Sequence, residues 1–187
     1  MLATVIVAGC AKEGPKFDAS DITGASFGGD FALQDPQGRT RTLEDFRGKV
    51  VVMFFGYTNC PDVCPATLAS LAQAMKELGS RADRVQVLFV TVDPARDTPA
   101  LLAKYVPAFD PRFVGLRGDD AATAKVAKEF RVLYNKVPGA TPGSYTVDHS
   151  AGSYVFDPKG RLRLYVANGQ GPDVFAHDIG LLLGASS

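Results

Sequence analysis

The sequence predicts a single domain with a three-layer α/β fold built on a mixed central sheet. Continuous apolar runs rich in Val and Phe occupy 50–55 and 85–92, and such runs are typical of strands buried on both faces. Apolar residues at helical spacing fill 66–78 between them. Since a strand–helix–strand order gives parallel strands, and a later hairpin signal adds antiparallel ones, the sheet is expected to be mixed.

Turn and capping residues place the remaining elements. Thr98 is a favourable N-cap and Pro99 a favourable first helical residue, which predicts a helix from 99. The Asp-Pro-Lys-Gly turn at 157–160 is a strong hairpin signal, whereas 132–142 is expected to be irregular. In chain order we also expect a short hairpin at 31–38 leading to 42–46, a strand at 113–116, a helix from Asp119 or Asp120 to about Phe130, strands at 152–156 and 161–166, and a terminal helix at 173–183.

Length and composition fit one ordinary globular domain. The chain has 187 residues, of which 46% are hydrophobic and 21% charged, so there is enough apolar material for one buried core. Lys plus Arg and Asp plus Glu number 20 each, and the charges are interspersed. Nucleic acid is therefore not an expected partner, because a phosphate backbone requires a basic patch.

The N-terminus resembles an export signal. Residues 2–8 are apolar but far short of the roughly 20 residues that cross a bilayer as a helix, and they end at small residues as secretory leaders do. The stretch Val7-Ala8-Gly9-Cys10 resembles the lipobox of bacterial lipoproteins, which implies that Cys10 is lipidated. The alternative is an apolar end with an unrelated cysteine. We expect a leader at 1–9, the lipidated cysteine and a tether at 10–26, and the folded domain at 27–187.

Export would leave two cysteines in the folded domain, in an oxidising compartment. Cys60 and Cys64 follow a predicted central strand, where ligands and reactive groups gather in open α/β sheets. Prolines after both cysteines disfavour helical conformation there, so the helix is expected to begin near Pro65 with Cys64 as its cap. That cap would lower the pKa of the Cys64 thiol and favour a thiolate. The pair is therefore a disulfide, a redox pair or a set of metal ligands.

Three separated motifs resemble the Sco/SenC family of thioredoxin-like copper proteins. The first is 48–71, centred on Phe55-Gly56-Tyr57-Thr58-Asn59-Cys60-Pro61-Asp62-Val63-Cys64-Pro65. The others are Val92-Asp93-Pro94-Ala95-Arg96-Asp97-Thr98-Pro99 and Tyr145-Thr146-Val147-Asp148-His149-Ser150. The three motifs occur in the same order as in the family, and the resemblance extends from about Phe27 to Leu183. The resemblance implies a thioredoxin-like three-layer α/β/α sandwich with a mixed central sheet, in which one copper ion is ligated by Cys60, Cys64 and His149.

The chemistry of these residues agrees with copper. Two thiolates are soft ligands suited to Cu(I), and imidazole binds copper as Cu(I) or Cu(II). A structural zinc site usually takes four protein ligands, and a fourth is not obvious in the sequence. The alternative for Cys60 and Cys64 is a structural disulfide, and the alternative for His149 is a surface or hydrogen-bonded histidine.

Other residues with reactive side chains have simpler interpretations. His177, beside Asp178 on the terminal helix, is expected to be structural. Asp62 and Asp148 either orient the ligands or are solvated loop carboxylates. We expect Met53 and Met75 in the core, and a local loop and capping network formed by Asp93, Arg96 and Asp97.

The resemblance implies a copper metallochaperone. Such a protein binds copper outside the cytoplasm and passes it to the CuA centre of cytochrome c oxidase subunit II. Its other partners would be a copper donor protein or a thiol reductant. The lipid on Cys10 would anchor it to the membrane at the periplasmic face of a bacterium.

Other functions use the same cysteines. A thiol–disulfide oxidoreductase would use Cys60 and Cys64 as a redox pair to reduce the CuA cysteines of the oxidase, which would make the protein an enzyme. Exchange through a mixed disulfide needs no histidine, so the presence of His149 favours copper. A copper or redox sensor is also compatible with these residues. A thiol peroxidase ranks lower, because Thr58 lies two residues before Cys60, whereas peroxiredoxins usually space the pair by three.

Overall fold

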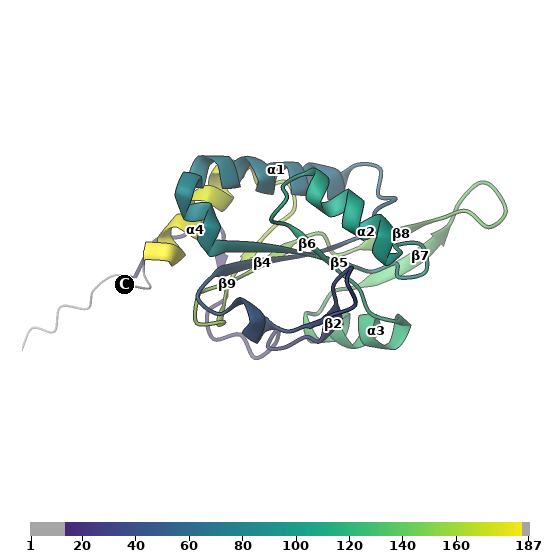
Figure 1. The fold of residues 1–187 in the computed structure, drawn as a ribbon, viewed down its shortest axis with the longest axis horizontal. Helices are drawn as coiled ribbons and strands as arrows, with labels where there is room; N and C mark the ends of the chain where they lie inside the picture. Colours follow the sequence, from purple (N-terminus) through teal and green to yellow (C-terminus); the bar gives the residue numbers. More distant parts are fainter. Residues whose placement is uncertain (1–13, 185–187) are drawn as a thin grey trace, which may run out of the picture.

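The structure is a computed structural model that describes residues 14–184. The expected leader and Cys10 lie outside these residues. Among the described residues we find no helix whose length and hydropathy would let it span a bilayer. Short 3-10 helices at 43–46, 79–84 and 106–108 join the main elements (Figure 1). The strands are β1 (Ser20–Asp21), β2 (Leu33–Gln34), β3 (Thr40–Arg41), β4 (Val50–Gly56), β5 (Val85–Thr91), β6 (Val114–Leu116), β7 (Tyr134–Pro138), β8 (Tyr145–His149), β9 (Ser153–Phe156) and β10 (Leu162–Val166), and the helices are α1 (Val63–Leu78), α2 (Pro99–Tyr105), α3 (Asp120–Glu129) and α4 (Pro172–Gly184).

The central sheet is mixed, as predicted. Its strand order is β1-β10-β9-β4-β5-β6, with β4, β5 and β6 parallel and the other neighbours antiparallel. β4 therefore has one parallel and one antiparallel neighbour: Met53 pairs with Leu88 on β5 and with Tyr154 on β9. α1 connects β4 to β5, which is the strand–helix–strand unit expected from the apolar pattern.

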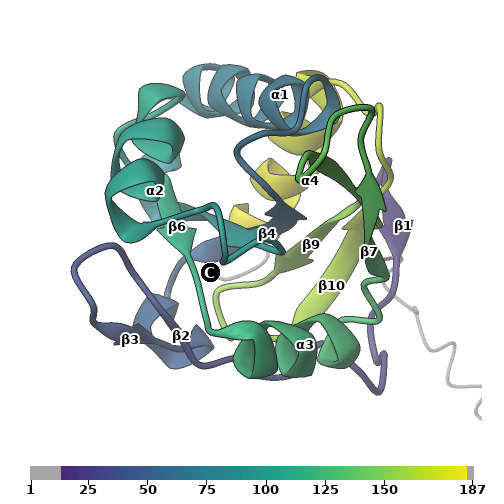
Figure 2. The ribbon, with the colours of Figure 1, turned by 90° about the vertical axis from the view of Figure 1, so that its right-hand side faces the viewer.

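Helices cover both faces of this sheet and give the three predicted layers. α1 and α4 lie together on one face, and α3 lies on the opposite face (Figures 1 and 2). Every residue of β4 and β5 is buried, because these strands have a layer on each side. Met53 and Met75 are core residues, as predicted. At the end of α3, the ring of Phe130 packs edge-on against Tyr154 and Phe156.

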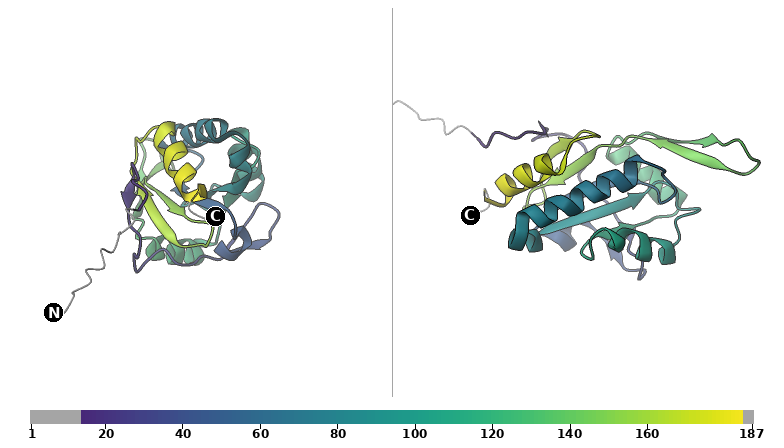
Figure 3. Two further views of the ribbon diagram at one scale, coloured as in Figure 1. Left: turned by 90° about the vertical axis from the view of Figure 1, so that its left-hand side faces the viewer. Right: turned by 90° about the horizontal axis from the view of Figure 1, so that it is seen from above.

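Most predicted boundaries hold within a few residues. Thr98 caps α2 by accepting the N–H of Leu101, and Asp119 caps α3 by accepting that of Ala122. The stretch 132–142 is an exception, because it contributes β7, which pairs with β8. These two strands form a separate hairpin that projects beyond the main sheet (Figure 3). β7 is mostly exposed and lacks the apolar alternation that identifies a half-buried strand, so its pattern resembles a loop.

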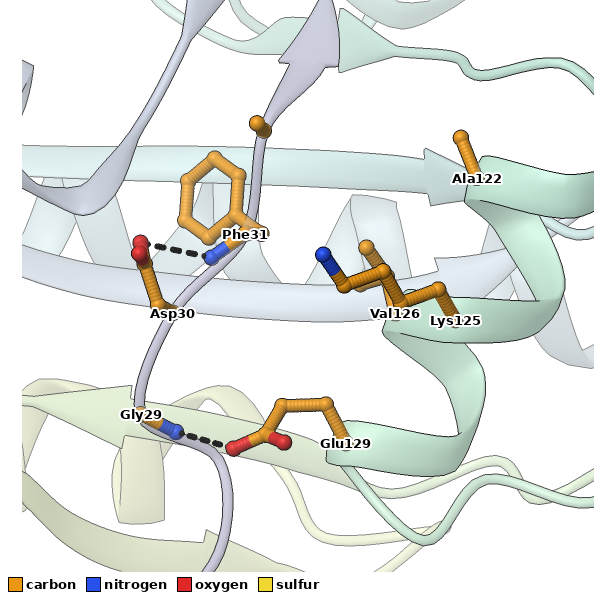
Figure 4. Close-up of a pocket in the computed structure, with 8 residues that line it drawn as sticks. Gly29, Asp30, Phe31, Ala122, Lys125, Val126 and Glu129 are labelled. Carbon is orange, nitrogen blue, oxygen red and sulfur yellow. Dashed lines mark hydrogen bonds between the residues drawn. The ribbon is translucent and has the colours of Figure 1, made fainter.

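The N-terminal segment is held against the domain at several points. β1, in the stretch expected to be a tether, pairs with β10 at the edge of the sheet. The backbone N–H of Asp18 donates to the carboxylate of Asp178 at 3.0 Å, and Nδ1 of His177 lies 2.8 Å from the same carboxylate. This contact gives His177 a structural role. Further along, the carboxylate of Glu129 accepts the N–H of Gly29 across a groove beside α3 (Figure 4).

Candidate metal centre

The first loop of the site follows β4 at its carboxyl end, where ligands gather in open α/β sheets. The carboxylate of Asp97 holds this loop from the connection after β5. It accepts the hydroxyl and the N–H of Thr58 at 2.6 and 3.1 Å, and the hydroxyl of Thr91 at 2.5 Å. Burial raises the pKa of Asp97, and these hydrogen bonds oppose that shift. The predicted loop network is confirmed, and it fixes the backbone two residues before Cys60.

Cys64 lies in the first turn of α1 and points into the core. The helix begins at Val63 with Asp62 as its N-cap, so Cys64 is not the cap and the predicted start near Pro65 is two residues late. Cys64 is 0% exposed, and burial raises the pKa of its thiol far above the usual value. The prediction of a lowered pKa is wrong, because desolvation of the thiolate outweighs the helix terminus. It is instead the sulfur of Cys60 that accepts a first-turn N–H, from Cys64 at 3.4 Å.

His149 ends β8 and lies opposite the cysteines. Its Nε2 is 3.6 Å from Sγ of Cys64, and its Nδ1 is 2.9 Å from the carbonyl oxygen of Ser150. Since a carbonyl oxygen can only accept, Nδ1 carries a proton, and in the neutral imidazole the lone pair of Nε2 therefore faces the sulfur. The rings of Tyr57 and Phe54 meet the imidazole edge-on, at interplanar angles of 86° and 68° and with centroids 6.0 and 6.3 Å away. This packing fixes the orientation of the imidazole.

The structure thus brings together the three residues that the sequence predicts as metal ligands. The two sulfurs and one imidazole nitrogen of Cys60, Cys64 and His149 all lie within 4.8 Å of one another. One ion with bonds of about 2.0–2.3 Å to such donors holds them about 4 Å apart, so small side-chain movements complete the set. Cys60 and His149 line a cleft of about 380 Å³, whereas Cys64 is buried.

Two acidic residues and two tyrosines complete the surroundings of the site. Asp62 and Asp148 line the cleft and are exposed, which favours their interpretation as solvated carboxylates. Tyr57 is buried, and its ring contacts the imidazole of His149. Tyr145 donates its hydroxyl to a buried carboxylate in the loop after β5. Neither tyrosine was predicted as part of the site, although Tyr57 lies in the same motif as Cys60 and Tyr145 in the same motif as His149.

The site brings two cysteines and a histidine together at the carboxyl end of the central strands of an α/β domain. By class, this is a thioredoxin-like metal-binding or redox domain. The protein is a member of the SCO1/SenC family, whose model matches residues 19–184. The resemblance inferred from three short motifs is therefore confirmed over almost the whole chain.

Curated relatives agree with this assignment. The chain is 44% identical over 139 residues to Protein SCO2 homolog, mitochondrial, of Bos taurus, a match that covers 73% of this chain and 52% of the relative. It is 40% identical over 139 residues to Protein SCO1, mitochondrial, of Saccharomyces cerevisiae, which covers 73% of this chain and 47% of that protein. The chain thus spans about half the length of these relatives.

Solved structures share the fold. Bradyrhizobium japonicum ScoI with copper bound has a TM-score of 0.75 at 41% identity, covering 83% of this chain and 98% of that one. Yeast Sco1 with copper bound has a TM-score of 0.75 at 35% identity, covering 83% and 87%. BsSco, described as a member of the Sco family of cytochrome c oxidase assembly proteins, shares the fold at a TM-score of 0.66 and 21% identity, covering 91% and 98%.

Proposed function

We propose that this protein is a copper metallochaperone, which carries one copper ion on Cys60, Cys64 and His149 and delivers it to the CuA centre of cytochrome c oxidase subunit II. The convergence of two sulfurs and an imidazole nitrogen within 4.8 Å is the observation that carries the proposal. Two further findings support it: relatives of the same fold bind copper, and the Sco family is one of cytochrome c oxidase assembly proteins.

The donor set fits copper, and Cu(I) in particular. Thiolates are soft ligands that select Cu(I), while imidazole accepts either oxidation state. In the neutral imidazole of His149, the Nδ1 proton is donated to Ser150 and the lone pair of Nε2 is left for the metal. Cys64 is a neutral thiol in the metal-free protein, since burial raises its pKa, so it must release its proton as the ion binds. The bound ion supplies the positive charge that keeps both sulfurs as thiolates.

The geometry also supports release of the ion to a partner. Three protein donors leave a coordination position for an incoming ligand. Cys60 is partly exposed and lines the open cleft, whereas Cys64 is fully buried. A sulfur ligand from the partner would therefore replace Cys60 first and Cys64 last. The exchange changes ligands only, and no electron moves.

The second candidate is a thiol–disulfide oxidoreductase that reduces the CuA cysteines. The sulfurs of Cys60 and Cys64 lie within 4.8 Å of each other, so a small movement brings them to disulfide distance. In that reaction the pair gives two electrons and two protons to the partner's disulfide and becomes a disulfide itself. His149 has no necessary part in the exchange. Dependence on His149 therefore separates the two candidates.

Copper delivery is tested by mixing the Cu(I)-loaded chain with the metal-free, reduced soluble domain of oxidase subunit II, and then measuring copper on each separated protein. We expect copper to move to the oxidase domain. In a parallel experiment the metal-free, reduced chain is mixed with the oxidase domain whose CuA cysteines form a disulfide, and the thiols formed on that domain are measured. The chaperone proposal would be overturned if the chain kept its copper in the first experiment. The reductase would be supported if, in addition, wild type and His149→Ala formed thiols equally on the oxidase domain in the second.

We propose further that the protein works outside the cytoplasm, anchored at the periplasmic face of a bacterial membrane by a lipid on Cys10. Residues 10–26 would form the anchor and tether, with the β1 part of the tether held against the copper-binding domain of 27–187. A Bacillus anthracis protein of the same fold, 26% identical, is described as a SCO1/SenC family lipoprotein, which supports the anchor. In that location a copper donor protein would load the site, or a thiol reductant would restore the cysteines.

A further inference from the structure

Arg96 connects the loop after β5 to the hairpin that carries His149. Its Nε pairs with the carboxylate of Asp93, and its Nη1 donates to the carbonyl oxygen of Tyr145 at 2.8 Å. The guanidinium carbon also lies 3.6 Å above the centre of the Tyr145 ring, within the range of a cation–π contact. One side chain thus makes an ion pair, a hydrogen bond and a stacking contact.

Asp93 is the buried member of this arrangement. It is 0% exposed, and its second carboxylate oxygen accepts the hydroxyl of Tyr145 at 2.8 Å. Asp93, Arg96 and Tyr145 therefore each contact the other two, and we call this group the Arg96 clamp. A carboxylate buried this deeply requires its partners, so the clamp has one favoured arrangement.

The β7–β8 hairpin depends on such contacts for its placement. It is a two-stranded sheet separate from the central one, and hairpins of this kind are marginally stable by themselves. Most of β7 is exposed, with Val137 39% exposed, so little of that strand packs on the domain. On β8, Val147 is buried, so the middle of this strand packs on the domain. The Arg96 clamp holds the same strand at its first residue, Tyr145.

Tyr145 and His149 are the two ends of β8. A strand of this length is a short, stiff segment, so fixing one end and the middle determines where the other end lies. We infer that Arg96 is a positioning residue for His149: through Tyr145 it holds β8 so that Nε2 reaches the two sulfurs. This inference rests on the proposed copper site but goes beyond it, because Arg96 lies outside the ligand set.

The test compares Arg96→Ala in two backgrounds, with Cu(I) affinity measured anaerobically by competition with a chromophoric Cu(I) chelator. Loss of a residue that orients a ligand typically lowers metal affinity about 10- to 100-fold, so we expect at least about a tenfold loss in the wild-type background. In the His149→Ala background, we expect less than about a twofold further loss, because Arg96 acts through His149. Arg96→Lys, which keeps a charge beside Asp93 but loses the stacked planar group, is expected to fall between.

Arg112→Ala is the matched control. Arg112 makes a comparable ion pair, with Asp110, at the opposite end of the strands: its carbonyl oxygen accepts the side chain of Gln86 at the start of β5. It should leave Cu(I) affinity unchanged. The inference would be overturned if Arg96→Ala lowered Cu(I) affinity by the same factor in both backgrounds, or lowered it in neither.

A second readout needs no metal. Amide hydrogen exchange of residues 145–149 in the metal-free chain should speed up in Arg96→Ala and remain near wild type in Arg112→Ala. Should Arg96→Ala fail to fold, Tyr145→Leu removes the stack and leaves Arg96 beside Asp93, and the same dependence on background is expected. If the wild-type chain bound no Cu(I), the proposed function would fail, and the exchange rates would still decide whether the clamp holds β8.

Discussion

Cys64→Ser is expected to lower the Cu(I) affinity of the chain by about a thousandfold, which corresponds to about 4 kcal/mol, while the domain stays folded. Cys64 is the ligand at the buried end of the site, and within residues 14–184 the only other thiol is that of Cys60, which is already a proposed ligand. A serine hydroxyl is a hard donor that does not ionise near neutral pH, so it cannot replace a soft thiolate. The fold should tolerate the change because the two side chains differ little in volume, and the imidazole of His149, 3.6 Å from the sulfur, offers the hydroxyl an acceptor.

Anaerobic Cu(I) titration measures this effect, with circular dichroism to confirm the fold. Cys10→Ser is the control, since it removes the remaining cysteine of the chain, which is the proposed lipid anchor and not a proposed ligand. It should bind one Cu(I) ion with wild-type affinity. A folded Cys64→Ser chain that still bound Cu(I) within about tenfold of wild type would mean that Cys64 is not a ligand.

Gly56→Ala is expected to damage both the fold and the metal site. Gly56 is the last residue of β4, and a methyl group there would lie 2.8 Å from Sγ of Cys64 and 2.9 Å from the ring of Phe89. Both neighbours are buried, so the sulfur must move or the core must expand. Overpacking of this kind costs about 1–3 kcal/mol of stability, and we expect a value near the upper end. Displacement of the sulfur should also lower Cu(I) affinity by at least about tenfold.

Denaturant unfolding of the metal-free chain, followed by Cu(I) titration of the folded variant, separates the two effects. Gly184→Ala serves as the control, because a methyl group at Gly184 lies within 4 Å of no described atom beyond its chain neighbours and its own helix backbone. Full Cu(I) affinity in a destabilised Gly56→Ala chain would contradict the expected link between the end of β4 and the position of Cys64.

The layers of the fold could be predicted because local patterns determine them. β4 and β5 are buried along their whole length, and an unbroken apolar run is the pattern that such strands require. The caps at Thr98 and Asp119 are likewise local, since each side chain accepts an N–H three residues further on. The three donors could be named because each lies in a short motif, although their meeting in space depends on the whole fold.

The setting of Cys64 was predicted incorrectly, although the sequence contained the relevant signal. Cys64, Leu68, Leu71 and Met75 are spaced by four, three and four residues, and all are buried on one face of α1. The helical apolar stripe thus begins at Cys64. The two prolines favoured a later helix start with Cys64 as the cap, but packing of α1 against the sheet outweighs that local preference.

The β7–β8 hairpin and the Arg96 clamp could not be predicted, for a different physical reason. Tyr145 and Arg96 are separated by 49 residues, and neither one has a sequence pattern that identifies the other as its partner. An exposed strand such as β7 buries little apolar surface, so it leaves little periodic signal. Its position is set by contacts between distant segments, and these become visible only in three dimensions.

X-ray absorption spectroscopy at the copper edge, on the Cu(I)-loaded chain, tests the central claim most directly. We expect a first coordination shell of two sulfurs and one nitrogen, with the outer-shell scattering of a single imidazole. In His149→Ala the imidazole scattering should disappear while both sulfurs remain. A wild-type shell of sulfur alone, or a His149→Ala spectrum identical to that of wild type, would contradict the assignment of Cys60, Cys64 and His149 as the three ligands.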